Sequence, residues 1–361
     1  MKYSVLLYVI VCFVSLLGTT DSNLMSRILS VLNPLKHRGG NGKALDHLPD
    51  LDLASGLVNL GNTCYMNSVL QSLFHSPKFK TAMLKSSMST PSFGAELQSL
   101  FQELQDFKKQ SNDIRPSRLA RSLDVNVNIQ EDAQEFLLKV LNQLEEEEDD
   151  DDKPSNSFKG QMIQRITCKE KNFKKEKENA FYDLSLDVSG NSNLLDSLAA
   201  LFASETLDDY KIPEQGRQQV EKVISIRQLP NTLCLHLKRF QFDMESGSMT
   251  KIGNPFDFPV ELDMSPYLDK HKTVEAAAVE QQKQQQLKYD LSAVIIHDGT
   301  VDIGHYYCYV KHSKKQWLKI NDNIVETIPF SKMKEDAIGL RASYGGNTAS
   351  RNAYLLLYTS R

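Results

Sequence analysis

The spacing of the hydrophobic residues changes along the chain, and this change limits the folds that are possible. From residue 64 to about 144 the apolar positions recur at i, i+3, i+4 and i+7, as in amphipathic helices. Two such sets are Met66, Val69, Leu70, Leu73 and Phe74, and Leu97, Leu100, Phe101 and Leu104. Beyond residue 154 the apolar residues form short β-type runs, among them FYDLSLDV, TLCLHLKRFQF, YDLSAVIIH, HYYCYVKH and AYLLLY. Because the helical patterns come first and the strands follow without alternation, the sequence predicts an α+β fold.

Two stretches interrupt the domain-like sequence, which begins at residue 54 and continues to residue 361. Residues 145–157 begin EEEEDDDDK, and because these like charges repel, we expect an acidic loop there. Residues 272–288 are rich in Ala and Gln, which favour helix, yet they lie between strand patterns. We interpret them as an insertion.

The N-terminal segment, residues 1–20, contains 18 uncharged residues between Lys2 and Asp21. As a helix they would span about 27 Å, enough to cross a thin bilayer. The small residues GTT before Asp21 equally suit a cleaved signal peptide. This stretch alone leaves both interpretations open, and residues 21–53 are interpreted as a linker.

Charge and cysteine content exclude some classes of protein. The 361 residues carry a net charge of −4, which argues against nucleic acid as a partner, because nucleic-acid-binding domains usually have a strongly basic face. The five cysteines, at positions 12, 64, 168, 234 and 308, show no Cys-x-x-Cys pair. We therefore expect no metal, no cofactor and no disulfide framework.

Cys64 lies directly after a turn and directly before an apolar helical pattern. Gly56 and Gly61 permit a tight turn, and Asn62 and Thr63 are residue types that cap helix starts. A thiolate is stabilised at a helix N-terminus, where backbone N–H groups and the helix dipole favour an anion. A small cysteine packed at a helix start is the alternative, unless the chain also supplies a base.

Two histidines qualify as that base. His305 follows a Gly-containing loop and begins a strand pattern, and His297 ends the preceding strand pattern. Asn321 and Asp322, 16 and 17 residues after His305, could orient an imidazole ring. Spacing alone does not bring these groups together.

Several motifs, in their order along the chain, resemble those of ubiquitin-specific proteases, the papain-like deubiquitinating cysteine proteases. They are GLVNLGNTCYMNSVLQSL, QEDAQEFL, LCLHLKRF, YDLSAVIIHDGTVDIGHYYCYVK, WLKINDNIV and AYLLLY. The resemblance covers residues 54–361. It implies a papain-like fold with a helical thumb, a β-rich palm and β fingers.

The resemblance also implies roles for single residues. Cys64 matches the nucleophile, His305 the general base, and Asn321 the third member of a Cys-His-Asn triad. Asn59 matches the side-chain donor of the oxyanion hole, and Asp322 is expected to support the triad.

Asp132 and Glu135 in QEDAQEFL match carboxylates that bind arginines of the ubiquitin tail. Their i, i+3 spacing predicts that they share one helix face. The expected partners are accordingly ubiquitin and ubiquitinated proteins, and the expected reaction is acyl transfer through a thioester.

Some features depart from the family pattern or leave alternatives. Many members carry a zinc ribbon with two Cys-x-x-Cys pairs, whereas here Cys168 stands in CKEK without a second pair, so we expect no zinc. A ubiquitin-binding pseudoenzyme, a hydrolase of another ubiquitin-like modifier and a secreted papain-like protease remain alternative functions.

The location of ubiquitin bears on the N-terminal segment. Because ubiquitin is cytosolic and nuclear, we favour an uncleaved transmembrane anchor with the catalytic domain facing the cytosol. Arg27, Lys36 and Arg38 after the segment agree with that orientation. The mitochondrial outer membrane and the endoplasmic reticulum are the candidate membranes.

Overall fold

A computed structural model of the chain describes residues 54–106, 113–147, 153–245, 247–269, 287–313, 316–341 and 350–361. The N-terminal segment 1–20 and the linker 21–53 lie outside these residues, as does the predicted insertion apart from its last two positions. Within the described ranges, no helix combines the length and the apolar character that crossing a membrane requires.

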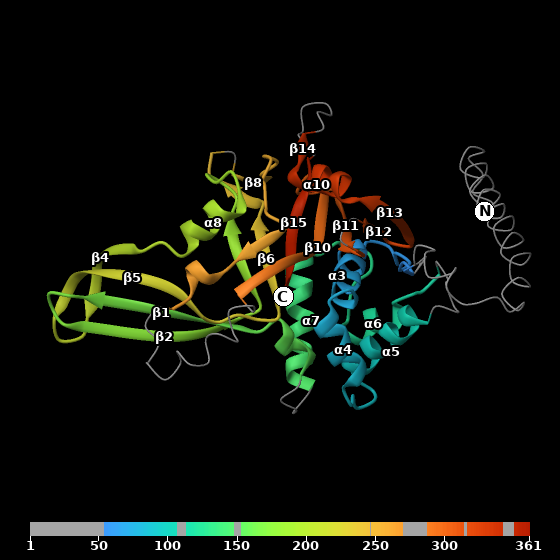
Figure 1. Cartoon of the computed structure of the whole chain (residues 1–361), viewed down its shortest axis with the longest axis horizontal. Coiled ribbons are helices and arrows are strands. Elements are labelled where there is room, and N and C mark those ends of the chain that lie inside the picture. Colours follow the sequence, from blue (N-terminus) through green and yellow to red (C-terminus); the bar gives the residue numbers. More distant parts are fainter. Residues whose placement is uncertain are drawn as a thin grey trace, which may run out of the picture. The chain divides into compact units, whose positions relative to one another are not determined.

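The first part of the described chain is helical, as the hydrophobic spacing predicts (Figure 1). Its helices are α3 (Cys64–Phe74), α4 (Pro77–Lys85), α5 (Phe93–Gln105), α6 (Ser117–Ser122) and α7 (Ala133–Glu147). Helix α3 differs from the predicted amphipathic pattern because all eleven of its residues are buried. Several of its polar side chains find partners within the protein: the Gln71 amide donates to the Ser55 carbonyl at 2.8 Å, and the Ser72 hydroxyl donates to the Ser68 carbonyl at 2.8 Å.

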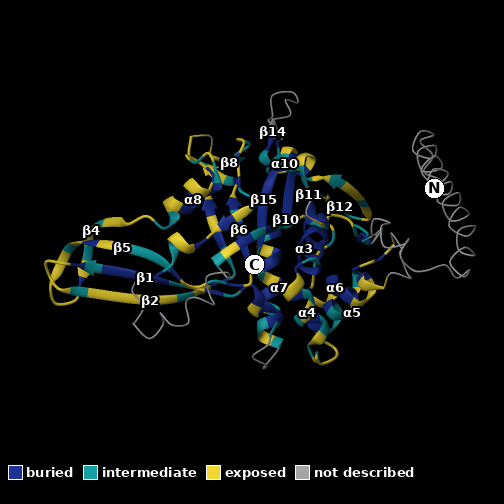
Figure 2. Ribbon diagram, in the orientation of Figure 1, coloured by how far each residue is buried: buried dark blue, intermediate teal, exposed yellow. Residues whose placement is uncertain are grey.

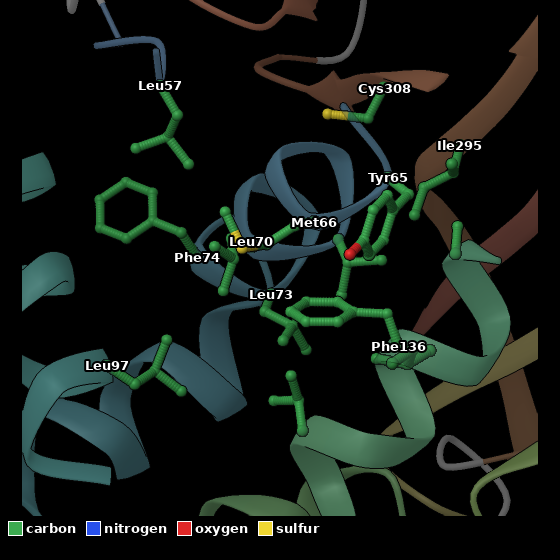
Figure 3. Packing of buried hydrophobic residues seen from close by; sticks show 14 of the residues in the cluster. Leu57, Tyr65, Met66, Leu70, Leu73, Phe74, Leu97, Phe136, Ile295 and Cys308 are labelled. Atoms are coloured by element: carbon green, nitrogen blue, oxygen red, sulfur yellow. The ribbon is translucent and has the colours of Figure 1, made fainter. Parts of the chain in front are cut away.

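Helix α3 can be buried on every side because it lies between the other helices and a β-sheet. The Tyr65 and Phe136 rings meet edge to face, 5.4 Å between centroids, where α3 packs on α7 (Figure 3). On another side α3 contacts strand β11 (Gly304–Lys311). The helix that begins with Cys64 is therefore the centre of the hydrophobic core.

The sheet beside α3 has nine strands, in the order β13-β12-β11-β10-β15-β6-β3, with β14 paired to β15 and β9 paired to β10. The strands are β3 (Asp183–Asp187), β6 (Thr232–Lys238), β9 (Glu261–Asp263), β10 (Lys288–Gly299), β11 (Gly304–Lys311), β12 (Gln316–Asn321), β13 (Ile324–Pro329), β14 (Leu340–Arg341) and β15 (Ser350–Ser360). Both faces of this sheet are covered. On β10, Ile295 packs into the cluster shared with the helices, whereas Val294 and Ile296 pack into a second cluster with α10 (Phe330–Ile338) and α8 (Leu194–Leu201).

A separate four-stranded sheet has the order β2-β1-β5-β4 (Figure 1). Its strands are β1 (Gly160–Cys168), β2 (Phe173–Phe181), β4 (Glu205–Ile212) and β5 (Gly216–Gln228). Much of its surface is exposed (Figure 2), and a small cluster of buried side chains holds it: Ile166, Cys168, Ile212 and Val220. A hairpin of β7 (Phe240–Asp243) and β8 (Ser248–Lys251), with the short helices η3 (Pro154–Ser157) and η4 (Ser265–Tyr267), completes the described fold.

The structure confirms the α+β class and corrects the bounds of the acidic loop. Residues 145–147 are the last turn of α7 and not loop, and the carboxylates of Glu145 and Glu147 have partners. The Glu147 carboxylate accepts hydrogen bonds from the N–H groups of Phe93 and Gly94 at the start of α5, at 3.1 and 2.7 Å. Residues 154–157 form η3, which is largely buried. At the other interruption, Lys288 belongs to β10 and not to the insertion.

Candidate active site

Cys64 is the first residue of α3 and is almost completely buried. Thr63 occupies the cap position, but its side chain makes no capping hydrogen bond to the helix. The Thr63 hydroxyl instead accepts from the Leu60 N–H at 2.9 Å, and the Asn62 amide donates to the Asn128 carbonyl at 2.7 Å. The predicted side-chain cap at Asn62 or Thr63 is therefore wrong, and both residues shape the preceding turn.

The two glycines of this turn are required by close approaches of the backbone. A Cβ atom on Gly61, which has φ = +150°, would lie 2.5 Å from the Val127 carbonyl oxygen. A Cβ atom on Gly56 would lie 2.5 Å from the Asp322 carbonyl oxygen. The next residue, Leu57, donates its N–H to that same carbonyl at 2.9 Å. The loop before Cys64 is thus held directly against the turn that follows β12.

His305 is the second residue of β11 and lies between Cys64 and Asn321. Its Nε2 donates to Asn321 Oδ1 at 2.6 Å, and the neighbouring Tyr306 N–H donates to Cys64 Sγ at 3.4 Å. A hydrogen bond with Cys64 is the main reason why the pKa of His305 rises to about 9; burial opposes this rise, and Asn321 and the charges of Cys64 and Asp322 add to it. Three residues from three elements therefore form one contiguous polar group.

Asp322 connects this group to the loop before α3. Its Oδ2 accepts from Asn59 Nδ2 at 3.1 Å and lies 4.0 Å from His305 Nε2, and its Oδ1 accepts from Asn67 Nδ2 at 2.8 Å. Its backbone is in the left-handed region, φ = 52°. This conformation turns the chain at the end of β12, and the side chains of Asn321 and Asp322 both lie near His305.

The amide of Asn59 is fixed at both ends. Its Oδ1 accepts from the N–H groups of Gly61 and Thr63 at 3.0 and 3.1 Å. Its Nδ2 donates to Asp322. An amide nitrogen carries two N–H groups, so this bond uses one of the two.

His297, the other candidate base, has different surroundings. Its side chain is 1% exposed and packs against the rings of Phe240, Tyr306 and Tyr354. Burial lowers its pKa to about 3, so the ring is neutral at physiological pH. We interpret His297 as a packing residue on β10, the strand next to the one that carries His305.

Asp132 lies at the start of a helix and not within it, which corrects one part of the prediction from its spacing to Glu135. Helix α7 begins at Ala133, and Asp132 precedes it. The Asp132 Oδ1 accepts from the N–H groups of Gln134 and Glu135 at 2.7 and 3.2 Å, and its Oδ2 accepts from the Tyr354 hydroxyl. Glu135 is exposed at the start of the helix.

The structure adds residues that the sequence reasoning missed. The Asn67 amide and the Tyr306 backbone N–H both contact the site, and Tyr354 holds Asp132. Asn67 lies three positions after Cys64 on the same helix face, so a polar residue at that spacing was the available signal. The other two contacts depend on how the sheet packs on the helices.

The described part of the chain shows no cluster of three or more His, Cys, Asp or Glu side chains able to hold a metal ion. Cys168 is buried in the small apolar cluster of the four-stranded sheet, with Ile166, Ile212 and Val220. Its surroundings are hydrophobic, and it contributes to packing there.

Comparisons with known proteins agree with the family that the sequence motifs resemble. The family described as ubiquitin carboxyl-terminal hydrolase matches residues 55–358. Ubiquitin carboxyl-terminal hydrolase 15 of Schizosaccharomyces pombe is 33% identical over 324 residues, covering 84% of this chain and 28% of its own length. Ubiquitin carboxyl-terminal hydrolase 48 of Danio rerio is 30% identical over 338 residues, covering 84% of this chain and 31% of its own length. The chain thus spans less than a third of the length of these curated relatives.

Among solved structures, a chain of the SAGA DUB module Ubp8/Sgf11/Sus1/Sgf73 bound to monoubiquitin is similar, with a TM-score of 0.68 and 26% identity. The match covers 85% of this chain and 69% of that chain. It confirms the papain-like α+β fold, with α3–α7 as the thumb, the nine-stranded sheet as the palm and the four-stranded sheet as the fingers. Fold, motifs and family match agree, and the chain belongs to the ubiquitin carboxyl-terminal hydrolase family.

Proposed function

We propose that this chain is a deubiquitinating cysteine protease that hydrolyses the isopeptide, peptide or thioester bond after the C-terminal glycine of ubiquitin. The observation that carries the proposal is the position of the His305 ring between Cys64 and Asn321. Family membership and the names of the relatives support it.

The contacts suit a thiolate–imidazolium pair. With Nε2 donating to Asn321, the other ring nitrogen of His305 accepts the proton of Cys64. Asn321 is neutral, but its carbonyl oxygen is enough to orient the ring. Asp322 adds negative charge near the imidazolium, since its Oδ2 lies 4.0 Å from Nε2.

The reaction then proceeds in two acyl transfers. Sulfur attacks the glycine carbonyl, and the oxyanion accepts hydrogen bonds from the second N–H of Asn59 and the backbone N–H of Cys64. The imidazolium protonates the leaving amine, which departs as the thioester forms. Water, deprotonated by His305, hydrolyses the thioester, releases the ubiquitin carboxylate and restores the thiol.

Asp132 and Glu135 belong to the proposed binding site for the ubiquitin tail. Carboxylates bind arginine side chains through paired hydrogen bonds, and Glu135 is exposed to such a partner. Asp132 is held by Tyr354 and by the start of α7, so its position is fixed before substrate binds.

Substitution of the nucleophile tests the proposal. We expect Cys64→Ala to abolish hydrolysis of ubiquitin-AMC while ubiquitin binding, measured by calorimetry, persists. Cys234→Ala is the matched control, because Cys234 is also buried but lies in β6, and it should keep the wild-type rate. Hydrolysis by Cys64→Ala would refute the assignment.

The proposed role of Glu135 in binding the ubiquitin tail is tested in the same assay. Glu135→Gln should raise KM and leave kcat within about twofold.

Two alternative functions remain distinguishable. A ubiquitin-binding pseudoenzyme would bind ubiquitin but would not react with a ubiquitin-vinyl-sulfone probe. A hydrolase of another ubiquitin-like modifier would be inhibited more strongly by that modifier than by ubiquitin. The raised pKa of His305, caused by its contact with Cys64, favours the active enzyme.

The N-terminal segment suggests where the enzyme acts. We infer that residues 1–20 anchor the chain in the mitochondrial outer membrane or the endoplasmic reticulum, with the catalytic domain in the cytosol. The 18 uncharged residues support the anchor, and a cytosolic substrate supports the orientation. The alternative is a cleaved signal peptide, which the intact mass of the purified chain would reveal.

A further inference from the structure

The side chain of Lys251 lies close to the turn that leads into His305. Lys251 is the last residue of β8, and its Nζ donates to three backbone carbonyls: His297 at 3.0 Å, Gly299 at 3.1 Å and Ser350 at 2.6 Å. An ammonium group has three N–H donors, so these three acceptors account for all of them.

The three carbonyls lie at one end of the palm sheet. Gly299 is the last residue of β10 and pairs with Ser350, the first residue of β15. On its other side Gly299 pairs with Gly304, and Asp298 pairs with His305. Lys251 therefore links β10 to β15 at Gly299 and Ser350, one residue pair away from the pair of Asp298 with His305.

The turn between β10 and β11 is also tightly packed. Thr300 N–H donates to the Ile303 carbonyl at 2.9 Å, which closes the turn. A Cβ atom on Gly304 would lie 2.1 Å from His297 Nε2, so the His297 ring lies directly against the backbone next to His305. A shift of the β10 end would therefore be transmitted to His305 rather than absorbed by empty space.

We propose that Lys251 is a positioning residue for His305: by holding the carbonyls of His297, Gly299 and Ser350, it fixes the β10–β11 turn and keeps the imidazole in register with Cys64. This inference rests on the proposed function for its meaning in catalysis. Lys251 reaches no reacting atom, so its effect is exerted through the backbone.

The burial of Lys251 indicates that its main role is to donate hydrogen bonds through its N–H groups. Burial lowers the pKa of the Lys251 ammonium to about 7, and the charge of Arg239 adds to this effect while Asp298 opposes it. A methionine of similar length would fill the space without placing a cation among apolar groups. It would leave the three carbonyls without their donor.

The test compares three full-length variants at pH 7. Lys251→Met should lower kcat for ubiquitin-AMC by about tenfold with KM within about twofold, because small misplacements of a catalytic group are costly. Lys251→Arg keeps charge and donors and should retain kcat within about threefold. Lys334→Met is the matched control: the Lys334 amine also donates to a backbone carbonyl, that of Phe258, but on α10, and kcat should not change.

A second readout reports on His305 directly. The rate at which iodoacetamide alkylates Cys64, resolved by peptide mass spectrometry, depends on the thiolate that His305 stabilises. We expect Lys251→Met to slow this alkylation at pH 7 by several-fold and Lys334→Met to leave it unchanged. If Lys251→Met does not fold, Lys251→Gln, which keeps two N–H donors, takes its place with a smaller decrease in both rates expected.

Wild-type kcat and alkylation in the Met variant, or in the Gln variant where that one is used, would overturn the inference. A decrease in kcat no larger than that of Lys334→Met would overturn it as well. Failure of the proposed function has a different signature: the wild-type chain would not hydrolyse ubiquitin-AMC at all. The alkylation rates of Cys64 would then still decide whether Lys251 positions His305.

Discussion

At the scale of single residues, Asp322 has structural and electrostatic roles at the same time. Its backbone carbonyl holds Leu57, and its carboxylate holds Asn59 and Asn67 and lies near His305. Asn59 and His305, the proposed oxyanion donor and the proposed base, are therefore coupled through one carboxylate. Changing its charge while keeping its shape separates the electrostatic role from the structural one.

Asp322→Asn is the variant that does this, because Asn tolerates the left-handed φ of 52° that Ala would strain. The pKa of His305 is raised to about 9, so kcat/KM should decline above about pH 9 as the imidazolium loses its proton. Without the charge at position 322 this decline should begin at lower pH. We also expect kcat to fall by about tenfold, since the Asn59 donor is less firmly oriented.

The same shift affects stability, and its sign follows from linkage. The folded-state pKa of His305 lies above the value of 6.5 for an unperturbed ring, so the protonated ring stabilises the fold. That contribution is complete below pH 6.5 and is lost as pH rises through about 9. Melting temperatures against pH should show a smaller loss in Asp322→Asn. Asp124→Asn, at an exposed residue with the same φ of 52°, is the control, and identical pH profiles for all three proteins would contradict the prediction.

At the scale of elements, the spacing of hydrophobic residues predicted the helices and strands that bury one or both of their faces. The helices from Cys64 onward and strands β3, β6, β10, β11 and β15 coincide with predicted patterns. The finger strands were missed because their side chains are mainly polar: β2 reads FKKEKENAF and is exposed along most of its length. Strands of this kind are specified by pairing with neighbours, which a local pattern does not reveal.

The site divides in the same way. Cys64, His305, Asn321, Asn59 and Asp322 come together as the resemblance implied, because each stands in a local motif. Asn67 and Lys251 act through partners more than forty positions away along the chain. The spacing of Asn67 from Cys64 is the one local signal for Asn67, and no local pattern marks Lys251. Asp132 was placed correctly in a motif but wrongly on a helix, since its carboxylate caps the helix from outside.

The small finger core predicts that the finger sheet unfolds locally. Val220 in β5 and Val294 in β10 are both buried, but Val220 belongs to a cluster of four buried side chains and Val294 to the large palm cluster. Val294→Ala should lower the free energy of global unfolding by about 1–3 kcal/mol. Val220→Ala should leave it within about 0.5 kcal/mol and speed amide exchange in the finger strands β1, β2, β4 and β5 alone.

Denaturant unfolding and hydrogen exchange by mass spectrometry measure these two effects. Equal losses of global stability for the two valine variants would show that the fingers unfold together with the palm. In that case, the sheet is stabilised by contacts at its base. The polar pairs there are candidates, because the buried Asp269 interacts with both Arg165 and Arg227.

At the scale of the whole molecule, the site exists only where two lobes meet. Cys64 comes from the central helix of the thumb, while His305 and Asn321 come from the palm sheet. The contact of α3 with β11 therefore determines both the stability of the core and the alignment of the site. All of these site residues lie within residues 54–361.

The anchor proposal predicts how the whole chain partitions between membrane and soluble fractions. A full-length chain with a C-terminal tag should remain in membranes after alkaline carbonate extraction, whereas residues 54–361 should be extracted. Val11→Lys places a charge at the centre of the uncharged stretch, and a lysine there costs about 2.5–3.5 kcal/mol of insertion free energy, so this variant should move to the soluble fraction. Ser22→Lys, which adds the same charge just outside the stretch, should stay in membranes. Extraction of the wild-type chain, or an intact mass that lacks residues 1–20, would contradict the anchor and favour a cleaved signal peptide.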